Sequence, residues 1–511
     1  MKLWDFLIIF IGTLPFYVYG IDYGYLGGVL AVPEFVQKYG TYDAAEDAYV
    51  LKSDKLSLLS SSAYIGGLIA CFVIPWLATK IGTKWGLVIT CTTFAVGGAL
   101  QLGAVNLAMF LVGRILTGVH ISSALILGQS YINEVAPAHL RGFGICLCLQ
   151  LLTFGNFSAS VITLGATSAG GKLAYQIPIS LCIMVGGLVA IALILMPKTP
   201  LQHALKGDWA NALAAVVKIR RAPADSQLVR AEMERLHHAT KDQVGSSKWS
   251  ELFQKGQLRR TLYSFGTYFF MNGFSGCNFY LTYASVFMAQ AGITNPWGIT
   301  VLIAGTNCFL TTPALALVER FGRRRLCFIG TIGCILMNLG AGLSYVIGKD
   351  TKNSNIALVV FVTLYIVFFA GFMAPSGWAF SAEIPSARLR AKTIAVTNIG
   401  NNIVTWAVGY GSPYLFQDPV NLRAKFCFFW LVGCLICGIF FYFCLYETKG
   451  LTHTEIDELM ASGIPARQSV GWAQDKVRSR VGTTHEADLS VADSDMKRGD
   501  LNDISVLEVE K

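Results

Sequence analysis

Charged residues are scarce in this sequence. Asp, Glu, Lys and Arg make up 14% of the 511 residues, whereas a soluble domain carries about 25%. Hydrophobic residues make up 54%, so polar groups are too few to cover a surface that faces water. The 51 glycines, about 10% of the chain against a usual ~7%, suit helices that pack closely inside a membrane. This composition argues against a soluble enzyme, a disordered protein and a nucleic-acid-binding protein.

The sequence also lacks a disulfide framework and metal-binding motifs. Its 13 cysteines lie almost wholly inside apolar runs, and no pair has metal-ligand spacing with His. We interpret them as small buried hydrophobic residues. The polar segments show no nucleophile–base pair and no phosphate-binding loop. We therefore expect no enzymatic activity, no metal and no cofactor other than a proton gradient.

The net charge of +9 does not indicate a nucleic-acid partner, because the charge is distributed unevenly. Residues 447–511 carry a net charge of −5, and the remaining residues carry +14. The positive excess lies in short loops between apolar runs. This distribution is typical of positive-inside membrane topology and not of a nucleic-acid-binding surface.

Twelve apolar runs are long enough to cross a membrane, which takes about 20 residues. They are 6–31, 56–79, 85–105, 107–131, 142–165, 174–196, 261–290, 297–318, 326–347, 356–381, 393–414 and 424–445. The stretch between the two sets of six has 12 basic and 6 acidic residues, and its composition is helical over 202–221 and 227–241. We predict an all-α membrane protein with two six-helix halves, 1–197 and 261–446, joined by the linker 198–260 and followed by the tail 447–511.

Lysine and arginine predict the orientation of these spans. The linker and the basic loops that contain Arg320 to Arg325 and Arg388 to Lys392 fall on one side, together with both termini. We expect this side to be the cytosol. We identify no cleavable signal before the first span. We expect the protein to lie in the plasma membrane. In the tail we expect a short helix around Glu455 to Met460, and disorder in the rest.

Acidic and basic residues recur at corresponding places in the two halves. Glu134 is followed by Arg141 in the first half, and Glu383 by Arg390 in the second. The loop Glu319 to Arg324 has a weaker counterpart in Thr79 to Lys84. Carboxylates and guanidinium groups at helix ends on one side can form an ion-pair clamp that acts as a cytosolic gate; its members are predicted to be Glu134, Arg141, Glu319, Arg323, Glu383 and Arg390. Internal repeats of this kind are typical of alternating-access transporters.

Several motifs occur in order with compatible spacing. They are Gly20-Ile21-Asp22-Tyr23-Gly24, Gly113-Arg114, Tyr131-Ile132-Asn133-Glu134, Pro197-Lys198-Thr199-Pro200, Ser275-Gly276-Cys277-Asn278, Trp378 to Glu383, and Glu447-Thr448-Lys449-Gly450-Leu451. With these motifs the sequence resembles the sugar porter family of the major facilitator superfamily, and more closely its fungal members, from about Tyr19 to Glu458. The resemblance implies two pseudo-symmetric six-helix halves with a substrate site between them.

Asp22 is a carboxylate inside an apolar span, where an unpaired charge is costly. Arg114, also in an apolar run, is its natural partner. In proton-coupled sugar porters the matching Asp binds the transported proton and the matching Arg lowers its proton affinity, so the resemblance implies this role for the pair. A structural ion pair in a uniporter, an exporter or a sensor is the alternative. We interpret His120 as a hydrogen-bonded core residue rather than a proton relay.

The resemblance also implies a substrate site. Asn278, Asn307, Phe369, Trp378 and Asn401 match family positions that contact sugar; each Asn could alternatively join helices. The sequence departs from the family at Asn272-Gly273, where a Gln-Gln pair is usual. It departs again at Ala370, at Asn402 and at Leu149, with Gln150 one residue later. Thr79 and Thr83 replace an Asp and an Arg, which predicts a weaker first-half clamp.

Taken together, these residues predict a monomeric secondary transporter of a sugar or polyol, with proton symport. The predicted substrate-binding residues are Asn272, Asn278, Asn307, Phe369, Trp378, Asn401, Asn402 and Gln150. The altered positions remove side chains that would bind the hydroxyl groups of a sugar. A larger or less hydroxylated substrate is therefore an alternative to a hexose. A non-sugar metabolite and a non-transporting sugar sensor are the competing functions.

Overall fold

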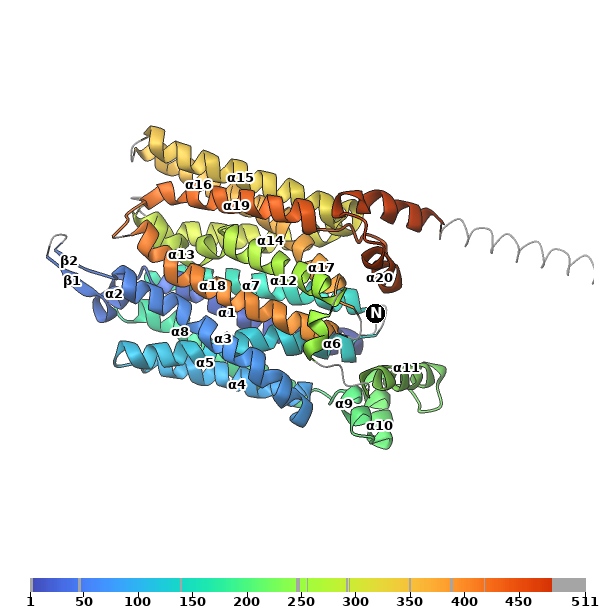
Figure 1. Ribbon diagram of the computed structural model, residues 1–511. Helices are drawn as coiled ribbons and strands as arrows, with labels where there is room; N and C mark the ends of the chain where they lie inside the picture. The colour runs from blue at the N-terminus through green and yellow to red at the C-terminus, as the bar shows by residue number, and fades with distance from the viewer. Residues whose placement is uncertain are drawn as a thin grey trace, which may run out of the picture.

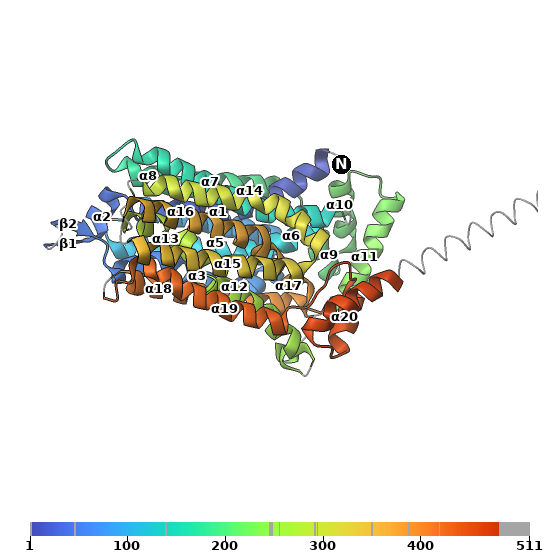
Figure 2. The same ribbon diagram turned by 90° about the horizontal axis from the view of Figure 1, so that it is seen from above.

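The structure is a computed structural model. It describes residues 3–479 apart from 45–46, 138–139, 245–248, 255, 291–292, 294, 349–350, 387–388 and 418. Long helices run side by side as one elongated bundle, with a small β-hairpin at one end and short helices at the other (Figures 1 and 2). We call these the hairpin end and the linker end. The chain is thus an all-α membrane protein, as predicted.

The first half contains six spans. They are α1 (Leu3–Val29), α3 (Ser53–Ile81), α4 (Thr83–Leu102), the continuous α5 (Leu107–Ser123), η1 (Ala124–Gly128) and α6 (Gln129–Val135), then α7 (Arg141–Thr167) and α8 (Leu173–Leu195). The segment η1 is a π-helical turn inside the fourth span. Such turns displace side chains from the regular helical position and are frequent at functional sites.

The second half repeats this plan. Its spans are α12 (Gln257–Phe274) with α13 (Cys277–Gln290), α14 (Pro296–Phe321), α15 (Arg323–Gly348), α16 (Lys352–Phe368) with η4 (Phe369–Met373) and α17 (Ala374–Glu383), α18 (Arg390–Phe416) and α19 (Phe426–Cys444). The π-helical turn η4 lies in the tenth span, the counterpart of the fourth. The seventh span breaks between α12 and α13, where Gly276 has a φ of 90° that favours glycine.

Ten of the twelve predicted spans form helical segments that are long and apolar enough to cross a membrane. The other two are the broken seventh span and α18, which carries Asn398, Asn401 and Asn402. Both contribute side chains to the interior between the halves, so polarity in these spans is a feature of the site and not of the bundle surface.

At the hairpin end, the loop after α1 folds into α2 (Pro33–Tyr39) and the strands β1 (Thr41–Asp43) and β2 (Ala48–Val50). The strands are antiparallel, with Thr41 opposite Val50. This hairpin is not among the elements predicted from the sequence.

At the linker end, the first linker helix is not the single helix predicted over 202–221. It is split into α9 (Pro200–Leu205) and α10 (Trp209–Arg220), because Gly207 has a φ of 77° and Asp208 caps the second helix by accepting a hydrogen bond from Asn211 N at 3.2 Å. The linker continues with α11 (Gln227–Val244) and η3 (Trp249–Phe253).

The tail is more ordered than predicted up to residue 479. It forms α20 (His453–Ala461), η6 (Ala466–Gln468) and helical residues over 469–479. Tyr446 Oη donates to Ile464 O at 2.8 Å and Glu447 N donates to Ser469 Oγ at 2.8 Å, so the tail is fixed to the second half. The expected disorder of the remaining tail falls on 480–511, outside the described residues.

The two halves contact each other through α3 and α18, α7 and α14, and α1 and α13. Among the described residues, hydrogen bonds join the halves at the hairpin end and around the middle of the bundle. At the hairpin end, Ser57 Oγ donates to Tyr410 O at 2.6 Å, and Trp297 Nε1 donates to Gly28 O at 3.1 Å. The described ion pairs at the linker end of the second half join residues of that half. The hairpin end of the interface is therefore held closed.

Candidate functional site

A cavity of about 890 Å³ lies between the halves in the middle of the bundle. Residues of both halves line it: Tyr19, Tyr23, Leu125, Leu149, Leu152, Thr153, Asn156, Tyr268, Asn272, Cys277, Asn278, Leu281, Asn307, Thr311, Phe369, Ala370, Ala374, Pro375, Trp378 and Asn401. None of these is charged. The lining fits an uncharged molecule with polar groups and an apolar face.

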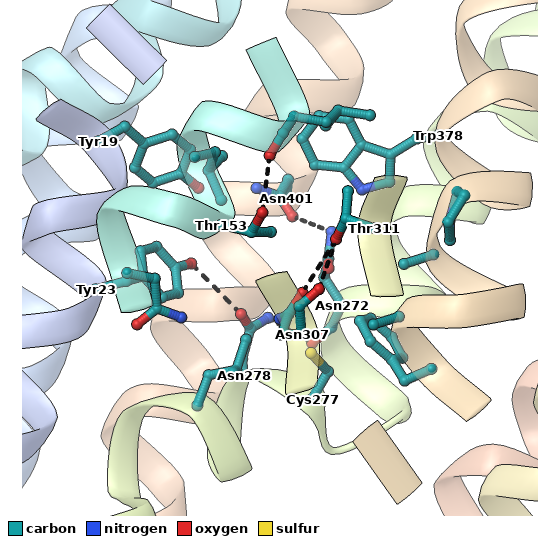
Figure 3. A pocket seen from close by; sticks show the side chains of 18 of the residues that line it. Tyr19, Tyr23, Thr153, Asn272, Cys277, Asn278, Asn307, Thr311, Trp378 and Asn401 are labelled. Carbon is teal, nitrogen blue, oxygen red and sulfur yellow. Dashed lines mark hydrogen bonds between the residues drawn. The ribbon is translucent and has the colours of Figure 1, made fainter. Parts of the chain in front are cut away.

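Amide side chains from several helices line this cavity, and three of them are joined by hydrogen bonds (Figure 3). Asn272 Nδ2 donates to Asn401 Oδ1 at 2.7 Å, and Asn278 Nδ2 donates to Asn272 O at 2.7 Å. Thr311 Oγ1 bonds Asn307 O at 2.8 Å. The amides come from α12, α13, α14 and α18. The broken seventh span places Asn272 and Asn278 on either side of its break, so both reach the same cavity.

Aromatic rings and leucines form the rest of the wall. The rings of Tyr268 and Trp378 lie 5.3 Å apart, and those of Tyr19 and Tyr23 lie 5.4 Å apart. Phe369 enters from the π-helical turn η4. An aromatic face can stack against the C–H face of a sugar ring or against another apolar surface.

Two predicted substrate-binding residues do not line this cavity. Asn402 Nδ2 donates to Ser122 Oγ at 3.0 Å and to Asn398 O at 2.9 Å, so Asn402 joins α18 to the first half. Gln150 Nε2 donates to Cys308 O at 3.3 Å, and Gln150 Oε1 accepts from Thr312 at 2.7 Å. Each residue is rotated about 100° from a neighbour that does line the cavity, Asn401 or Leu149. The amides of Asn402 and Gln150 are used for helix packing.

Asp22 and Arg114 form a buried ion pair outside this cavity. Arg114 Nη1 donates to Asp22 Oδ1 at 2.6 Å, and each side chain is 3% exposed. Arg114 Nη1 also donates to Tyr25 Oη at 3.0 Å, and Tyr25 Oη donates to Gln101 Oε1 at 2.6 Å. These hydrogen bonds offset part of the cost of burying the two charges, although Arg114 Nε has no hydrogen-bond partner in the described structure. The predicted pairing is therefore present.

A narrow chamber with room for about one water molecule borders this ion pair. It is lined by Asp22, Tyr23, Leu26, Ser60, Ala63, Tyr64, Arg114, Ile121 and Thr282. Tyr23 also lines the central cavity, so its side chain borders both spaces. Tyr64 Oη donates to Tyr23 Oη at 3.4 Å, and Tyr23 Oη donates to Asn278 Oδ1 at 3.4 Å (Figure 3). A hydrogen-bonded chain thus connects the chamber of Asp22 with the amides of the central cavity.

His120 borders neither space. Its Nε2 donates to Pro15 O at 3.1 Å, and its ring packs edge-on against Phe94 at 5.3 Å. This geometry agrees with the interpretation of His120 as a core residue that joins two helices.

The predicted gate residues of the second half form a cluster at the linker end. Arg323 Nη2 lies 2.7 Å from both Glu319 Oε1 and Glu383 Oε1. Thr448 Oγ1 donates to Glu383 Oε2 at 2.5 Å. Arg390 lies within electrostatic reach of Glu383 and Asp457. This cluster holds α14, α15, α17 and the start of the tail together.

The corresponding cluster of the first half lacks an arginine–carboxylate pair among its described side chains. Glu134 Oε1 accepts from Thr83 Oγ1 at 3.3 Å, where the second half has Arg323 with Glu383. The side chain of Arg141 lies outside the described residues. The contact of Glu134 with a hydroxyl is consistent with the weaker first-half clamp that Thr83 predicts.

Sequence reasoning did not identify several cavity residues. Tyr19 and Tyr23 flank Asp22 and lie four residues apart, so their spacing places both on one helical face. Asn156 and Thr153 are the polar residues of an otherwise apolar stretch of α7, and Thr311 lies one turn after Asn307. Polar residues at helical spacing inside apolar spans were the signal that could have found them.

Comparisons with known proteins agree with this architecture. The chain matches the family model described as "Sugar (and other) transporter" over residues 7–460. The major facilitator-type transporter ecdD of Aspergillus rugulosus is 30% identical over 500 residues, which cover 93% of this chain and 91% of that protein. The low-affinity glucose transporter HXT3 of Saccharomyces cerevisiae is 24% identical over 93% of this chain and 85% of that protein.

Solved structures of the E. coli xylose transporter XylE share the fold. XylE bound to 6-bromo-6-deoxy-D-glucose, described as a proton:xylose symporter, aligns with a TM-score of 0.73 at 19% identity and covers 89% of this chain and 99% of that one. Its partially occluded, inward-open form aligns with a TM-score of 0.71 at 20% identity, covering 88% and 99%.

Proposed function

The chain belongs to the sugar transporter family of the major facilitator superfamily, and on this premise we propose that it carries a sugar or polyol across a membrane by alternating access with proton symport. The family consists of membrane transporters and not of enzymes. The proposal adds the substrate class, the proton coupling, the plasma membrane and the cytosolic position of the linker end.

The observation that carries the substrate class is the lining of the central cavity. It combines amides from four helices with aromatic rings, and no charged side chain is among its residues. A neutral polyol can exchange hydrogen bonds with Asn272, Asn278 and Asn401, and its apolar face can stack on Trp378 or Phe369. A charged substrate would be buried without a partner charge, which is unfavourable.

The proposed proton site is Asp22. Arg114 neutralises the ionised carboxylate, and a proton taken up by Asp22 would remove the charge that holds Arg114. The carboxyl oxygen would then carry the proton, while Arg114 keeps its contact with Tyr25. The chain from Tyr64 through Tyr23 to Asn278 offers a route by which this change reaches the substrate amides.

The proposed motion is a rocking of the halves about the central cavity. Hydrogen bonds at the hairpin end would break when that end opens, and the clusters at the linker end would then bring the halves together there. Ser57 with Tyr410 and Trp297 with Gly28 are the contacts that this opening must release.

The leucines in the cavity favour one alternative substrate. Leu125, Leu149, Leu152 and Leu281 give the cavity an apolar wall that a fully hydroxylated hexose does not need. A neutral metabolite with an apolar portion, or a substituted sugar, would use this wall while its polar groups meet the amides.

Uptake in cells that lack their own hexose carriers tests the proposal. Labelled hexoses, pentoses, disaccharides, polyols and apolar glycosides are compared with and without a protonophore. Symport is supported if one neutral substrate accumulates in the cells and the protonophore abolishes this accumulation. If the protonophore does not change uptake, proton coupling is refuted and facilitated transport remains. Transport of a charged substrate alone would refute the assigned substrate class.

A further inference from the structure

The loop between α3 and α4 and the loop between α14 and α15 repeat one backbone geometry at the linker end. Gly82 has φ and ψ of 92° and 160°, and Gly322 has 93° and 161°. Two residues later, a long basic side chain reaches the end of the last span of its half. Lys84 Nζ donates to Ile194 O at 2.8 Å, and Arg324 donates to Leu445 O. The two loops are therefore structural counterparts, and their charges can be compared position by position.

The second-half loop is rich in carboxylates. Glu447 Oε1 accepts from Arg323 N at 2.9 Å, and Glu447 Oε2 lies against Gly322. In the first half the atom against Gly82 is the neutral amide oxygen Gln202 Oε1. Thr79 stands in place of Glu319. The first half thus keeps the backbone of this cluster and Glu134, the counterpart of Glu383, but it has no carboxylate at the positions of Glu319 and Glu447.

Positive charge accumulates at the same place. Lys198 and Lys218 lie close enough to Lys84 for their positive charges to interact with it. Lys206 Nζ donates a hydrogen bond to Lys80 O at 3.3 Å. In the described part of the chain, none of these five lysines forms an ion pair with a carboxylate, although Glu232 of the same linker pairs with Arg220. We call Lys80, Lys84, Lys198, Lys206 and Lys218 the lysine patch. All except Lys84 are exposed.

The lysine patch lies at the edge of the apolar surface of the bundle. Lys80 Nζ lies 4.2 Å from the ring centre of Trp76, and Lys84 Nζ lies 5.2 Å from that of Trp85; both tryptophans are exposed. Leu195, which is 77% exposed, ends the apolar face of α8 three residues before Lys198. Tryptophan and lysine at the end of an apolar face mark the depth of lipid headgroups. Figure 1 shows α9 and α10 just beyond this end of α3 and α4.

We propose that the lysine patch binds the headgroups of anionic phospholipids in the leaflet at the linker end. A lipid phosphate would supply the negative charge that Glu319 and Glu447 supply in the second half. It would also tie α9 and α10 to the loop between α3 and α4. Charge complementarity and the position at the headgroup depth select a lipid over a soluble anion. The proposal does not depend on the transported substrate.

The test measures binding of a fluorescent phosphatidylserine to the purified full-length protein in phosphatidylcholine-containing micelles. The patch variant carries Lys198→Gln, Lys206→Gln and Lys218→Gln. Its matched control carries Lys38→Gln, Lys172→Gln and Lys425→Gln, which remove the same charge at the hairpin end. We expect the patch variant to bind phosphatidylserine on the order of tenfold more weakly or worse, while the control binds as the wild type does. Raised salt should weaken wild-type binding.

Three outcomes would overturn the proposal. The first is a wild type that binds phosphatidylserine no better than fluorescent phosphatidylcholine. The second is an equal loss in the patch variant and the control. The third is displacement of the lipid by inorganic phosphate or glycerophosphoserine at concentrations comparable to those of phosphatidylserine, which would indicate a soluble anion. An unchanged thermal midpoint in phosphatidylcholine shows that the patch variant is folded, and Lys198→Gln alone serves if it is not.

Discussion

Arg114 Nη1 and Asp22 Oδ1 are 2.6 Å apart in the interior of the first half, and both side chains are almost fully excluded from the surface. The pair does not line the central cavity. It instead borders a separate chamber, and Tyr23 is the side chain that lies between the two spaces. A substrate in the central cavity would therefore act on the ion pair through intervening side chains and not by direct contact.

Asp22→Asn should abolish accumulation of the substrate against its gradient while leaving exchange across the membrane. The amide oxygen can still accept from Arg114, but the side chain no longer takes up a proton. Accumulation should fall about tenfold or more, since a pH difference of one unit across the membrane supplies about 1.4 kcal/mol, which is a factor of ten in the accumulation ratio. Asp5→Asn on the same helix is the control and should accumulate normally. Accumulation by Asp22→Asn equal to wild type would exclude Asp22 as the proton site.

Tyr23→Phe should preserve substrate binding but weaken its dependence on protons. The ring still separates the chamber from the cavity, whereas the hydroxyl that joins Tyr64 to Asn278 is removed. The measurement is the ratio of uptake without and with a protonophore, beside substrate-induced thermal stabilisation. Tyr268→Phe changes a cavity tyrosine that does not border the chamber, and its ratio should match the wild type. An unchanged ratio in Tyr23→Phe, with a wild type that depends on protons, would remove Tyr23 from coupling.

Asn401 and Asn402 are neighbours on α18 with different surroundings, and alanine substitutions should separate them. Asn401→Ala should raise KM about two- to tenfold, the cost of one neutral hydrogen bond to the substrate. Asn402→Ala should leave KM nearly unchanged and lower the thermal midpoint, because it leaves Ser122 without its partner across the interface. Radiolabelled uptake and thermal unfolding measure the two effects. A larger change in KM for Asn402→Ala would restore that residue to the substrate site.

The contrast between these two residues shows what periodicity can and cannot predict. The bounds of the apolar runs lie within several residues of the observed helices, and ten of the twelve runs have the length and hydropathy that crossing a membrane requires in the described residues. Pairing of Asp22 with Arg114 also followed, since either charge alone would be too costly in an apolar helix. Periodicity does not predict which side of α18 faces the cavity, because the packing of the two halves determines this. A step of one residue turns the side chain by about 100° around the helix, which is enough to move it out of the cavity.

Short polar segments were harder to predict than spans. The helical composition on both sides of Gly207 predicts one continuous helix. The structure has a break there because Gly207 adopts a positive φ and Asp208 caps the second helix. The polarity of residues 461–479 predicts disorder. Their order comes from contacts with the second half, such as that of Ile464 with Tyr446, which composition does not reveal.

Glu447→Gln should destabilise the second half. The buried carboxylate accepts from Arg323 N at 2.9 Å, Arg324 N at 3.2 Å, Thr448 N at 3.1 Å and Lys449 N at 3.0 Å, so it caps α15 and fixes the start of the tail. The amide of Gln keeps one acceptor oxygen and places an N–H₂ group against N–H donors. The expected loss is about 1–3 kcal/mol, measured as a lower thermal midpoint in detergent. Glu458→Gln is the matched control: Glu458 pairs with Lys476 at 2.8 Å in an exposed position, and such pairs contribute ~1 kcal/mol or less. Equal midpoints for the two variants would mean that the carboxylate of Glu447 does not hold this end of the bundle.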